Sequence, residues 1–283
     1  MIDITRRHFG LLAAGITLTT VSSGIAYAET TLERIKRTKK LTVGTETSYR
    51  PFEYIDNGKI VGYGPDILKQ VVKALDVELV QLDVPWQGIL PGVLAGKFDF
   101  VATAVGVNEE RAKRYAFTTP IADASPYAGK RKGDSMKTVQ DLNGKVVGTL
   151  LAGSTEPVAR ALNDQLKAEG GEGFELKLYT AFTDTHVALA NGEIDCCIEP
   201  LPTLALLVKE RSDIFELMAP VKAGTKYAFT GWVTRPEDTD LRDFISGVIT
   251  GMKKDGSLGE LQEKWFGFKM DLPDSGYLPP NAI

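Results

Sequence analysis

The chain has 283 residues, of which 43% are apolar, enough to bury one or two hydrophobic cores. Its formal net charge is −4, and an acidic chain without a basic run is not built to bind nucleic acid or anionic lipid. The whole chain holds two cysteines and two histidines. We therefore expect no metal site, and, because His8 falls in the N-terminal signal described next, a Ser-His-Asp triad would depend on His186 alone.

The first 28 residues have the composition of an export signal. The pair Arg6-Arg7 precedes a mildly apolar run from Leu11 to Ile25, and Ala26-Tyr27-Ala28 supplies the small residues of a cleavage site. A membrane anchor is the alternative, but the run is short and diluted by Thr, Ser and Gly. We therefore expect residues 1–28 to be a twin-arginine signal peptide and the remainder to be exported to the periplasm.

After this signal, strand-like and helix-like patterns alternate. Apolar runs bounded by turn residues predict strands, and apolar residues at helical spacing predict helices. The first half reads as helix 31–40, strand 41–48, a loop 49–54, a hairpin turn 56–59, helix 67–75, strand 77–84, a turn and short helix 86–96, and strand 98–107. Alternation of this kind favours a mainly parallel sheet covered by helices.

A second α/β pattern follows the extended stretch 115–130. It reads as strand 145–151, loop 153–157, helix 158–169, strand 176–179, helix 183–191, strand 194–198 and helix 200–211. The chain is extended again from 225 to 233 and then helical, and residues 271–283 show little pattern. We predict two α/β lobes joined by crossings near 122–128 and 222–227, with lobe 1 formed by 29–124 plus 225–283 and lobe 2 by 125–224.

The stretch from Phe98 to Arg111 carries the first candidate site. An apolar strand turns at Asn108, a good helix N-cap, and Arg111 lies in the first turn beyond the strand. Small ligands bind at the carboxyl ends of strands in α/β sheets, and a guanidinium there offers a carboxylate two parallel N–H donors. The alternative is a solvated Arg111 paired with Glu109 or Glu110.

Cys196 and Cys197 are adjacent and lie in an apolar run. Neighbouring cysteines can close only a strained ring, so two buried thiols are favoured over a bond. A redox switch is the other interpretation.

Several motifs, in this order and spacing, resemble the periplasmic solute-binding proteins of ABC importers that take up polar amino acids. They are Leu-Thr-Val-Gly-Thr (41–45), Tyr-Arg-Pro-Phe-Glu-Tyr (49–54), Asp-Asn-Gly-Lys-Ile-Val-Gly-Tyr (56–63), Trp-Gln-Gly-Ile-Leu-Pro (86–91), Ala-Gly-Lys-Phe-Asp-Phe (95–100), Asn-Glu-Glu-Arg (108–111), Phe-Thr-Thr-Pro (117–120), Asp-Leu-Asn-Gly-Lys-Val-Val-Gly (141–148), Ala-Asn-Gly-Glu-Ile-Asp (190–195) and Gly-Ser-Leu-Gly-Glu-Leu-Gln-Glu-Lys-Trp-Phe-Gly (256–267). The resemblance implies the two-lobed type II periplasmic-binding-protein fold, with a ligand cleft between the lobes.

The resemblance also implies a set of ligand-binding residues. Arg111 would hold the ligand's α-carboxylate, helped by backbone N–H groups around Ser154 and Thr155, for which ordinary helix capping is the alternative. Tyr49 and Trp86 would form aromatic walls, with core packing as the alternative. The other positions are Ala104 and Gly106 on the strand before Arg111, and Glu46, an acid for a cationic group or simply a solvated strand end.

Two positions depart from the family pattern. The family usually places an Asp for the ligand's ammonium where this chain has Pro200, with Glu199 one position earlier and so on the opposite face of a strand. Gly106 stands where a Ser or Thr hydroxyl is usual. Glu199 is therefore a candidate ammonium partner only if the backbone shifts, and the ligand could be a modified, N-alkylated or cyclic amino-acid-like molecule.

The function that follows is capture of an amino-acid-like zwitterion by lobe closure and delivery to a membrane permease, by a monomer without cofactor. The alternative is an enzyme on the same scaffold, similar to cyclohexadienyl or arogenate dehydratases, with Glu199 as a general acid. A sensor domain of a membrane receptor is a third possibility, for which we find no later apolar run that could span a bilayer.

Overall fold

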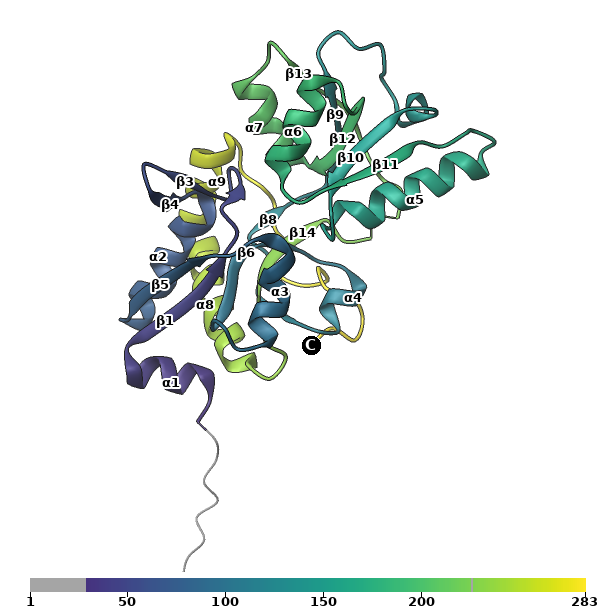
Figure 1. The fold of residues 1–283 in the computed structure, drawn as a ribbon. Helices are drawn as coiled ribbons and strands as arrows, with labels where there is room; N and C mark the ends of the chain where they lie inside the picture. Colours follow the sequence, from purple (N-terminus) through teal and green to yellow (C-terminus); the bar gives the residue numbers. More distant parts are fainter. Residues whose placement is uncertain (1–28, 225) are drawn as a thin grey trace, which may run out of the picture.

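The computed structural model describes residues 29–224 and 226–283. The predicted signal peptide lies outside the described residues. Two lobes, each built on its own mixed sheet, lie one above the other in Figure 1. The predicted two-lobed α/β fold is confirmed. Within the part of the chain that the structure describes, no helix has both the length and the apolar character needed to cross a membrane.

The sheet of lobe 1 is parallel at its centre. Strand β1 lies between β5 and β6 and runs parallel to both, whereas β14, from the far end of the chain, pairs antiparallel with β6. The order is β5 (Glu78–Asp83), β1 (Lys40–Thr45), β6 (Phe100–Gly106), β14 (Phe229–Thr234) and β7 (Ala116–Phe117), with β8 (Ala122–Asp123) also on β14. All residues of β6 are buried, as expected for a parallel strand covered on both faces.

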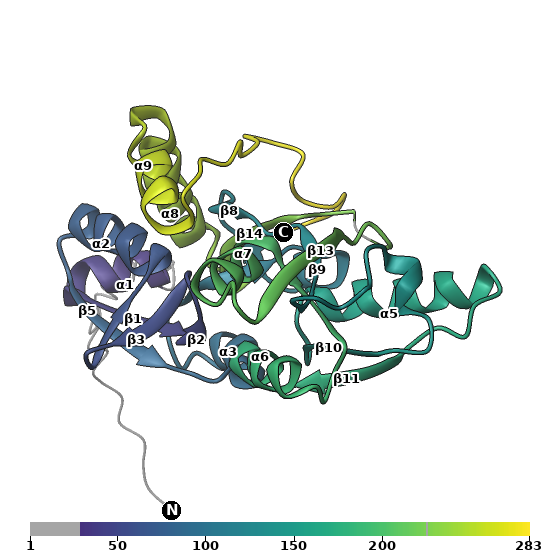
Figure 2. The same cartoon turned by 90° about the horizontal axis from the view of Figure 1, so that it is seen from above.

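Helices cover both faces of this sheet. Helix α3 lies on one face, and α2, α8 and α9 lie on the other (Figure 2). The helices are α1 (Thr31–Thr38), α2 (Tyr63–Leu75), α3 (Trp86–Leu94), α4 (Glu109–Ala112), α8 (Thr239–Asp255) and α9 (Ser257–Phe266). The predicted turn at 56–59 is present in a small sheet of β2 (Ser48–Tyr49), β3 (Glu53–Asp56) and β4 (Lys59–Val61).

Lobe 2 repeats the same strand arrangement. Strand β10 lies between parallel neighbours β11 and β12, and β9 pairs antiparallel with β12. The order is β11 (Glu175–Tyr179), β10 (Val146–Leu150), β12 (Cys196–Pro200), β9 (Pro126–Arg131) and β13 (Phe215–Pro220), and the helices are η1 (Val139–Leu142), α5 (Thr155–Ala168), α6 (Phe182–Asn191) and α7 (Leu201–Glu210). Helix α5 begins at Thr155, three residues before the predicted start.

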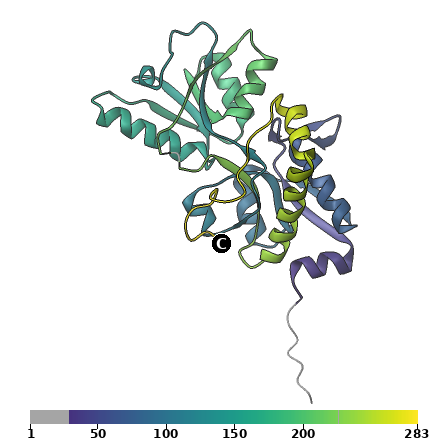
Figure 3. The same ribbon diagram turned by 180° about the vertical axis from the view of Figure 1, so that it is seen from behind.

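Two strand connections run side by side between the lobes. One leads from β8 to β9, and the other from β13 back to β14. The N–H of Ala124 on the first donates to the carbonyl of Ala228 on the second, with 2.6 Å between nitrogen and oxygen. The C-terminal stretch packs on lobe 1: Leu272 is buried in its core, and the N–H of Ile283 donates to the carbonyl of Ala112 at 3.0 Å (Figure 3).

Candidate functional site

A small cavity lies between the lobes, where the central strands of both sheets end. It measures about 10 Å³, room for roughly one water molecule. Its lining residues are Glu46, Tyr49, Trp86, Ala104, Gly106 and Arg111 from lobe 1 and Leu150, Gly153, Ser154 and Phe182 from lobe 2. Seven of these are residues that the sequence had singled out, so the fold brings most of the predicted set together. We call this space the inner cavity.

Arg111 is buried at the boundary between the lobes. The side chain of Asn108 caps α4 by accepting the N–H of Arg111 at 2.7 Å, which orients the residue at the end of β6. Its guanidinium donates to the carbonyl of Gly106 at 2.8 Å and, across the cleft, to the carbonyl of Ala152 at 2.6 Å. Among the described residues no carboxylate lies within ion-pair distance of it, and burial lowers the pKa of Arg111 to about 10. The alternative of a solvated ion pair with Glu109 or Glu110 does not describe this side chain.

Aromatic rings from both lobes close around the cavity. The guanidinium carbon of Arg111 stands 5.2 Å from the centre of the Trp86 ring, within cation–π range. Tyr49 stacks on Phe182 of lobe 2 with 4.8 Å between ring centres and 28° between planes. Burial, followed by the charges of Glu53, Glu46 and Glu199, raises the pKa of Tyr49 well above its usual value, so its hydroxyl keeps its proton. The predicted aromatic residues Tyr49 and Trp86 both line the cavity, so they are not only core residues.

Glu46 lies at the cavity wall directly after β1. Its carboxylate accepts both the N–H and the hydroxyl of Ser48. Burial raises the pKa of Glu46, which the Ser48 hydrogen bonds partly offset. A buried acid facing the same space as Arg111 gives the cavity one anionic and one cationic group, the complement of a zwitterion.

The start of α5 faces Gly106. A Cβ placed on Gly106 would stand 2.4 Å from the Cβ of Ser154, so only glycine permits this approach of the lobes. Ser154, the N-cap of α5, makes no capping hydrogen bond through its side chain. The Thr155 hydroxyl instead pairs with that of Thr149 at 2.7 Å, away from the cavity lining. The side chain of Ser154 therefore reaches the inner cavity, and that of Thr155 does not.

Glu199 is fully buried on the other side of β12 and does not line the inner cavity. One carboxylate oxygen lies 2.8 Å from Nε2 of His186 on α6, and the other has no hydrogen-bond partner among the described residues. The backbone shift that an ammonium contact would require is not seen. The alternation of strand side chains explains this position, because the residue before Pro200 points to the α6 and α7 face.

We expect the His186–Glu199 pair to make stability pH-dependent. Burial disfavours the charged imidazole, but the Glu199 carboxylate outweighs it, so the pKa of His186 is raised above its ordinary value. Such a group contributes its full stabilisation at pH values below the pKa that histidine has in the unfolded chain, about 6.5. That contribution is lost as the pH rises through the higher pKa of the folded protein. Losing a buried hydrogen-bond partner costs about 1–3 kcal/mol, so His186→Ala should cost this much at about pH 6 and less at about pH 9.

Urea unfolding of both proteins at the two pH values measures this difference. Thr183→Ala, an exposed position on the same helix, is the control and should show no pH-dependent difference. A cost for His186→Ala that is equal at both pH values would contradict the assignment of the charge to His186.

Both cysteines lie in the buried strand β12. Cys196 and Cys197 are free, buried thiols, as predicted, and burial raises the pKa of Cys196 to about 12 and that of Cys197 well above its usual value. Thiolates are the reactive form, so neither residue has the environment of a redox switch. Within residues 29–224 and 226–283 no cluster of three potential metal-ligating side chains is present.

Sequence reasoning missed three lining residues in lobe 2: Leu150, Gly153 and Phe182. Leu150 is the last residue of β10, and Phe182 is the first residue of α6, directly after the short loop that follows β11. Trp86 occupies the equivalent place after β5 in lobe 1. An aromatic residue at the start of the helix after the second strand of a lobe is the signal that could have identified Phe182.

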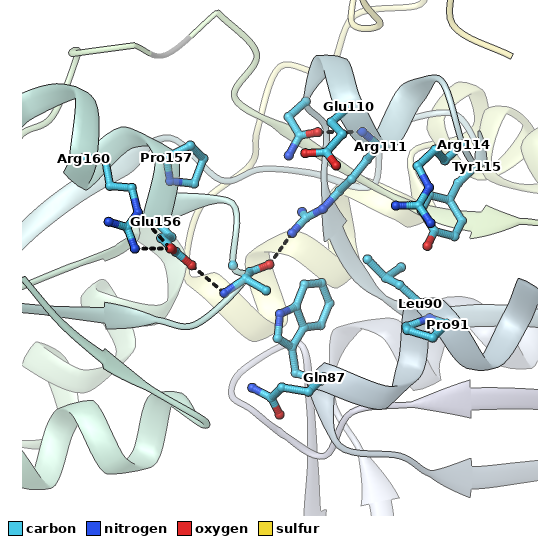
Figure 4. Close-up of a pocket in the computed structure, with 14 residues that line it drawn as sticks. Gln87, Leu90, Pro91, Glu110, Arg111, Arg114, Tyr115, Glu156, Pro157 and Arg160 are labelled. Carbon is cyan, nitrogen blue, oxygen red and sulfur yellow. Dashed lines mark hydrogen bonds and ion pairs between the residues drawn. The ribbon is translucent and has the colours of Figure 1, made fainter.

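A second, larger space opens on the other side of Arg111. This outer cavity measures about 430 Å³ and lies between α3 and α4 of lobe 1 and the start of α5 in lobe 2 (Figure 4). Trp86, Arg111 and Gly153 line both cavities.

The chain is similar to known binding proteins over most of its length. Residues 41–268 match the bacterial extracellular solute-binding proteins, family 3. The L-cystine-binding protein TcyJ of Escherichia coli (strain K12) is 30% identical over 239 residues, covering 83% of this chain and 86% of that protein. An ancestral arginine-binding protein bound to arginine matches with a TM-score of 0.72 and 29% identity, over 81% of this chain and 99% of the other.

A third similarity bears on the enzyme alternative. The ancestral amino acid-binding protein AncCDT-1, a precursor of cyclohexadienyl dehydratase, matches with a TM-score of 0.74 and 26% identity, over 84% of this chain and 100% of the other. It too is named as a binding protein, and Glu199, the candidate general acid, does not reach the inner cavity. With a family match that spans residues 41–268, this chain belongs to the bacterial extracellular solute-binding proteins of family 3 and is a binding protein rather than an enzyme.

Proposed function

We propose that the protein captures an amino acid or amino-acid-like zwitterion between its lobes and delivers it to the permease of an ABC importer. The observation that carries this proposal is Arg111, a buried guanidinium that has no carboxylate partner among the described residues. Burying an unpaired charge is costly, and a ligand carboxylate would offset that cost with two parallel hydrogen bonds.

In this proposal each lining residue has a role. Arg111 and the backbone N–H groups at Ser154 and Thr155 hold the carboxylate, and Tyr49 and Trp86 flank the ligand. Ala104 and Gly106 form the floor, and Glu46 takes the cationic group. The family's ammonium-binding Asp is replaced by Pro200, and Glu199 is turned toward His186, so Glu46 is the acid of this cavity that we assign to the ligand.

Binding requires the lobes to separate, because the inner cavity holds about one water as it stands. We propose lobe 1 as 29–124 plus 225–283, lobe 2 as 125–224, and the paired connections near Ala124 and Ala228 as the hinge. Opening would then break three contacts between the lobes: the stacking of Tyr49 on Phe182, the Arg111–Ala152 hydrogen bond and the Arg50–Glu210 ion pair of 2.9 Å. Export through the twin-arginine route and a monomeric state complete the proposal.

A thermal-shift screen tests this function on the purified protein. The panel contains the common L-amino acids, L-cystine, N-methylated amino acids and, as a control class, neutral sugars. At a ligand concentration about 100 times Kd, mass action should add about 2.7 kcal/mol of stability, raising Tm by several degrees. Stabilisation by a sugar and by no amino-acid-like compound would overturn the proposal.

A further inference from the structure

The outer cavity is large enough for a ligand group of its own. At about 430 Å³ it falls within the roughly 300–1,000 Å³ typical of small-molecule sites. It is formed by both lobes and shares the Trp86 and Arg111 side chains with the inner cavity. In Figure 4 Arg111 extends toward lobe 2 between the two groups of side chains that line this space. The inner and outer cavities therefore meet at one guanidinium.

Two of the charges in the outer cavity neutralise each other. Nε and Nη2 of Arg160 donate to one oxygen of Glu156 at 2.9 and 2.7 Å, and the other Glu156 oxygen accepts the N–H of Ala152 at 2.7 Å. This pair lies within lobe 2 and ties helix α5 to the loop before it, so each of its two charges already has an opposite charge as a partner.

Two other charges on the cavity wall have no such partner. Neither Arg114 nor Glu110 forms a hydrogen bond or an ion pair through its side chain with any described residue, and Arg114 only approaches the ring of Tyr115, at 5.9 Å. Once Arg111 is assigned to a ligand in the inner cavity, the described residues that line the outer cavity leave Arg114 as a cation and Glu110 as an anion without a partner. A purely anionic or cationic group would meet a like charge there, whereas a zwitterion meets a complement at each end.

We propose that the outer cavity is a second compartment of the ligand site and holds the far end of an elongated ligand that carries an amino-acid head at each end. Arg114 takes the second carboxylate, and Glu110 takes the second ammonium. This inference rests on the proposed function, in which Arg111 holds the first head.

Two thioethers that differ only in the second head make the test. L-Cystathionine carries two amino-acid heads, and S-propyl-L-cysteine keeps the first head and the chain but lacks the second. Calorimetric titration of the purified protein should give a Kd for L-cystathionine at least about tenfold lower, the gain expected from new charge-assisted hydrogen bonds. Equal affinities for the two compounds would overturn the inference.

Substitutions show which residues provide the additional affinity for L-cystathionine. Arg114→Gln and Glu110→Gln should each remove most of it and leave the Kd of S-propyl-L-cysteine unchanged, which also shows that the variants are folded. Lys113→Gln removes a charge from the neighbour of Arg114, which is exposed like Arg114 but does not line the cavity, and it should change neither Kd. Equal losses in Lys113→Gln and Arg114→Gln would mean only a general charge effect and would contradict the assignment.

The same titrations separate this inference from the proposed function. If S-propyl-L-cysteine binds in an Arg111-dependent way and L-cystathionine binds no more tightly, the proposed function stands and the second compartment is wrong. If neither thioether binds, the second compartment is wrong; both proposals fall only if, in addition, no amino-acid-like compound of the thermal-shift panel binds with dependence on Arg111.

Discussion

Replacing Arg111 with Gln should raise the Kd of the protein's ligand at least about 100-fold, because a lost bidentate, charge-assisted pair costs roughly 3 kcal/mol or more. The Gln side chain keeps a donor for the Ala152 carbonyl but cannot present the two parallel donors of a guanidinium. The Kd of Arg111→Lys should lie between that of the wild type and that of Arg111→Gln, since an ammonium retains the charge but lacks the two parallel donors. Calorimetric titration with the strongest hit of the thermal-shift screen measures all three proteins.

The ligand-free proteins provide the control for folding. Arg111 is buried without a carboxylate partner among the described residues, and burial lowers its pKa to about 10, so Arg111→Gln removes a group whose charge is costly to bury. We therefore expect the variant to lose little stability without ligand, while Lys113→Gln keeps wild-type affinity. An Arg111→Gln protein that binds as tightly as the wild type would remove the basis of the carboxylate assignment.

Replacing Gly106 with Ala should open the ligand-free protein. The added Cβ would stand 2.4 Å from the Cβ and 2.7 Å from the hydroxyl of Ser154, on the opposite lobe, so the lobes cannot approach as closely as they do here. Overpacking of this kind costs about 1–3 kcal/mol, which corresponds to roughly a ten- to hundredfold shift in the ratio of open to closed molecules. Small-angle X-ray scattering would detect the shift as a larger radius of gyration.

A second substitution shows whether the contact with Ser154 is the cause. In the double variant Gly106→Ala, Ser154→Gly, the obstructing side chain is gone, and the wild-type scattering curve should return. If the single variant scattered like the wild type, or if the double variant stayed open, the Gly106–Ser154 contact would not control closure.

Much of the fold was predictable because it follows from local pattern. The apolar run before Asn108 becomes the buried strand β6, and the Asp56–Lys59 turn closes the β3–β4 hairpin as expected. Arg111 could be singled out because the strand β6 and the helix-capping residue Asn108 precede it in the sequence, which places it at the carboxyl edge of a sheet. Tyr49 and Trp86 were found through a resemblance, and both line the inner cavity.

The remaining features depend on side chains that the sequence separates and the fold brings together. Tyr49 meets Phe182, Gly106 meets Ser154, and Arg111 reaches Ala152, and each pair is joined across the boundary between the lobes. Glu199 was a candidate by position, but its carboxylate lies against His186 because strand alternation turns it to that face. The sequence by itself determined two lobes and an arginine at a strand end, since backbone periodicity and capping are local. Tertiary structure decided which acid shares a cavity with that arginine, and it formed the outer cavity beside it. Distances across the cleft have no counterpart in sequence spacing.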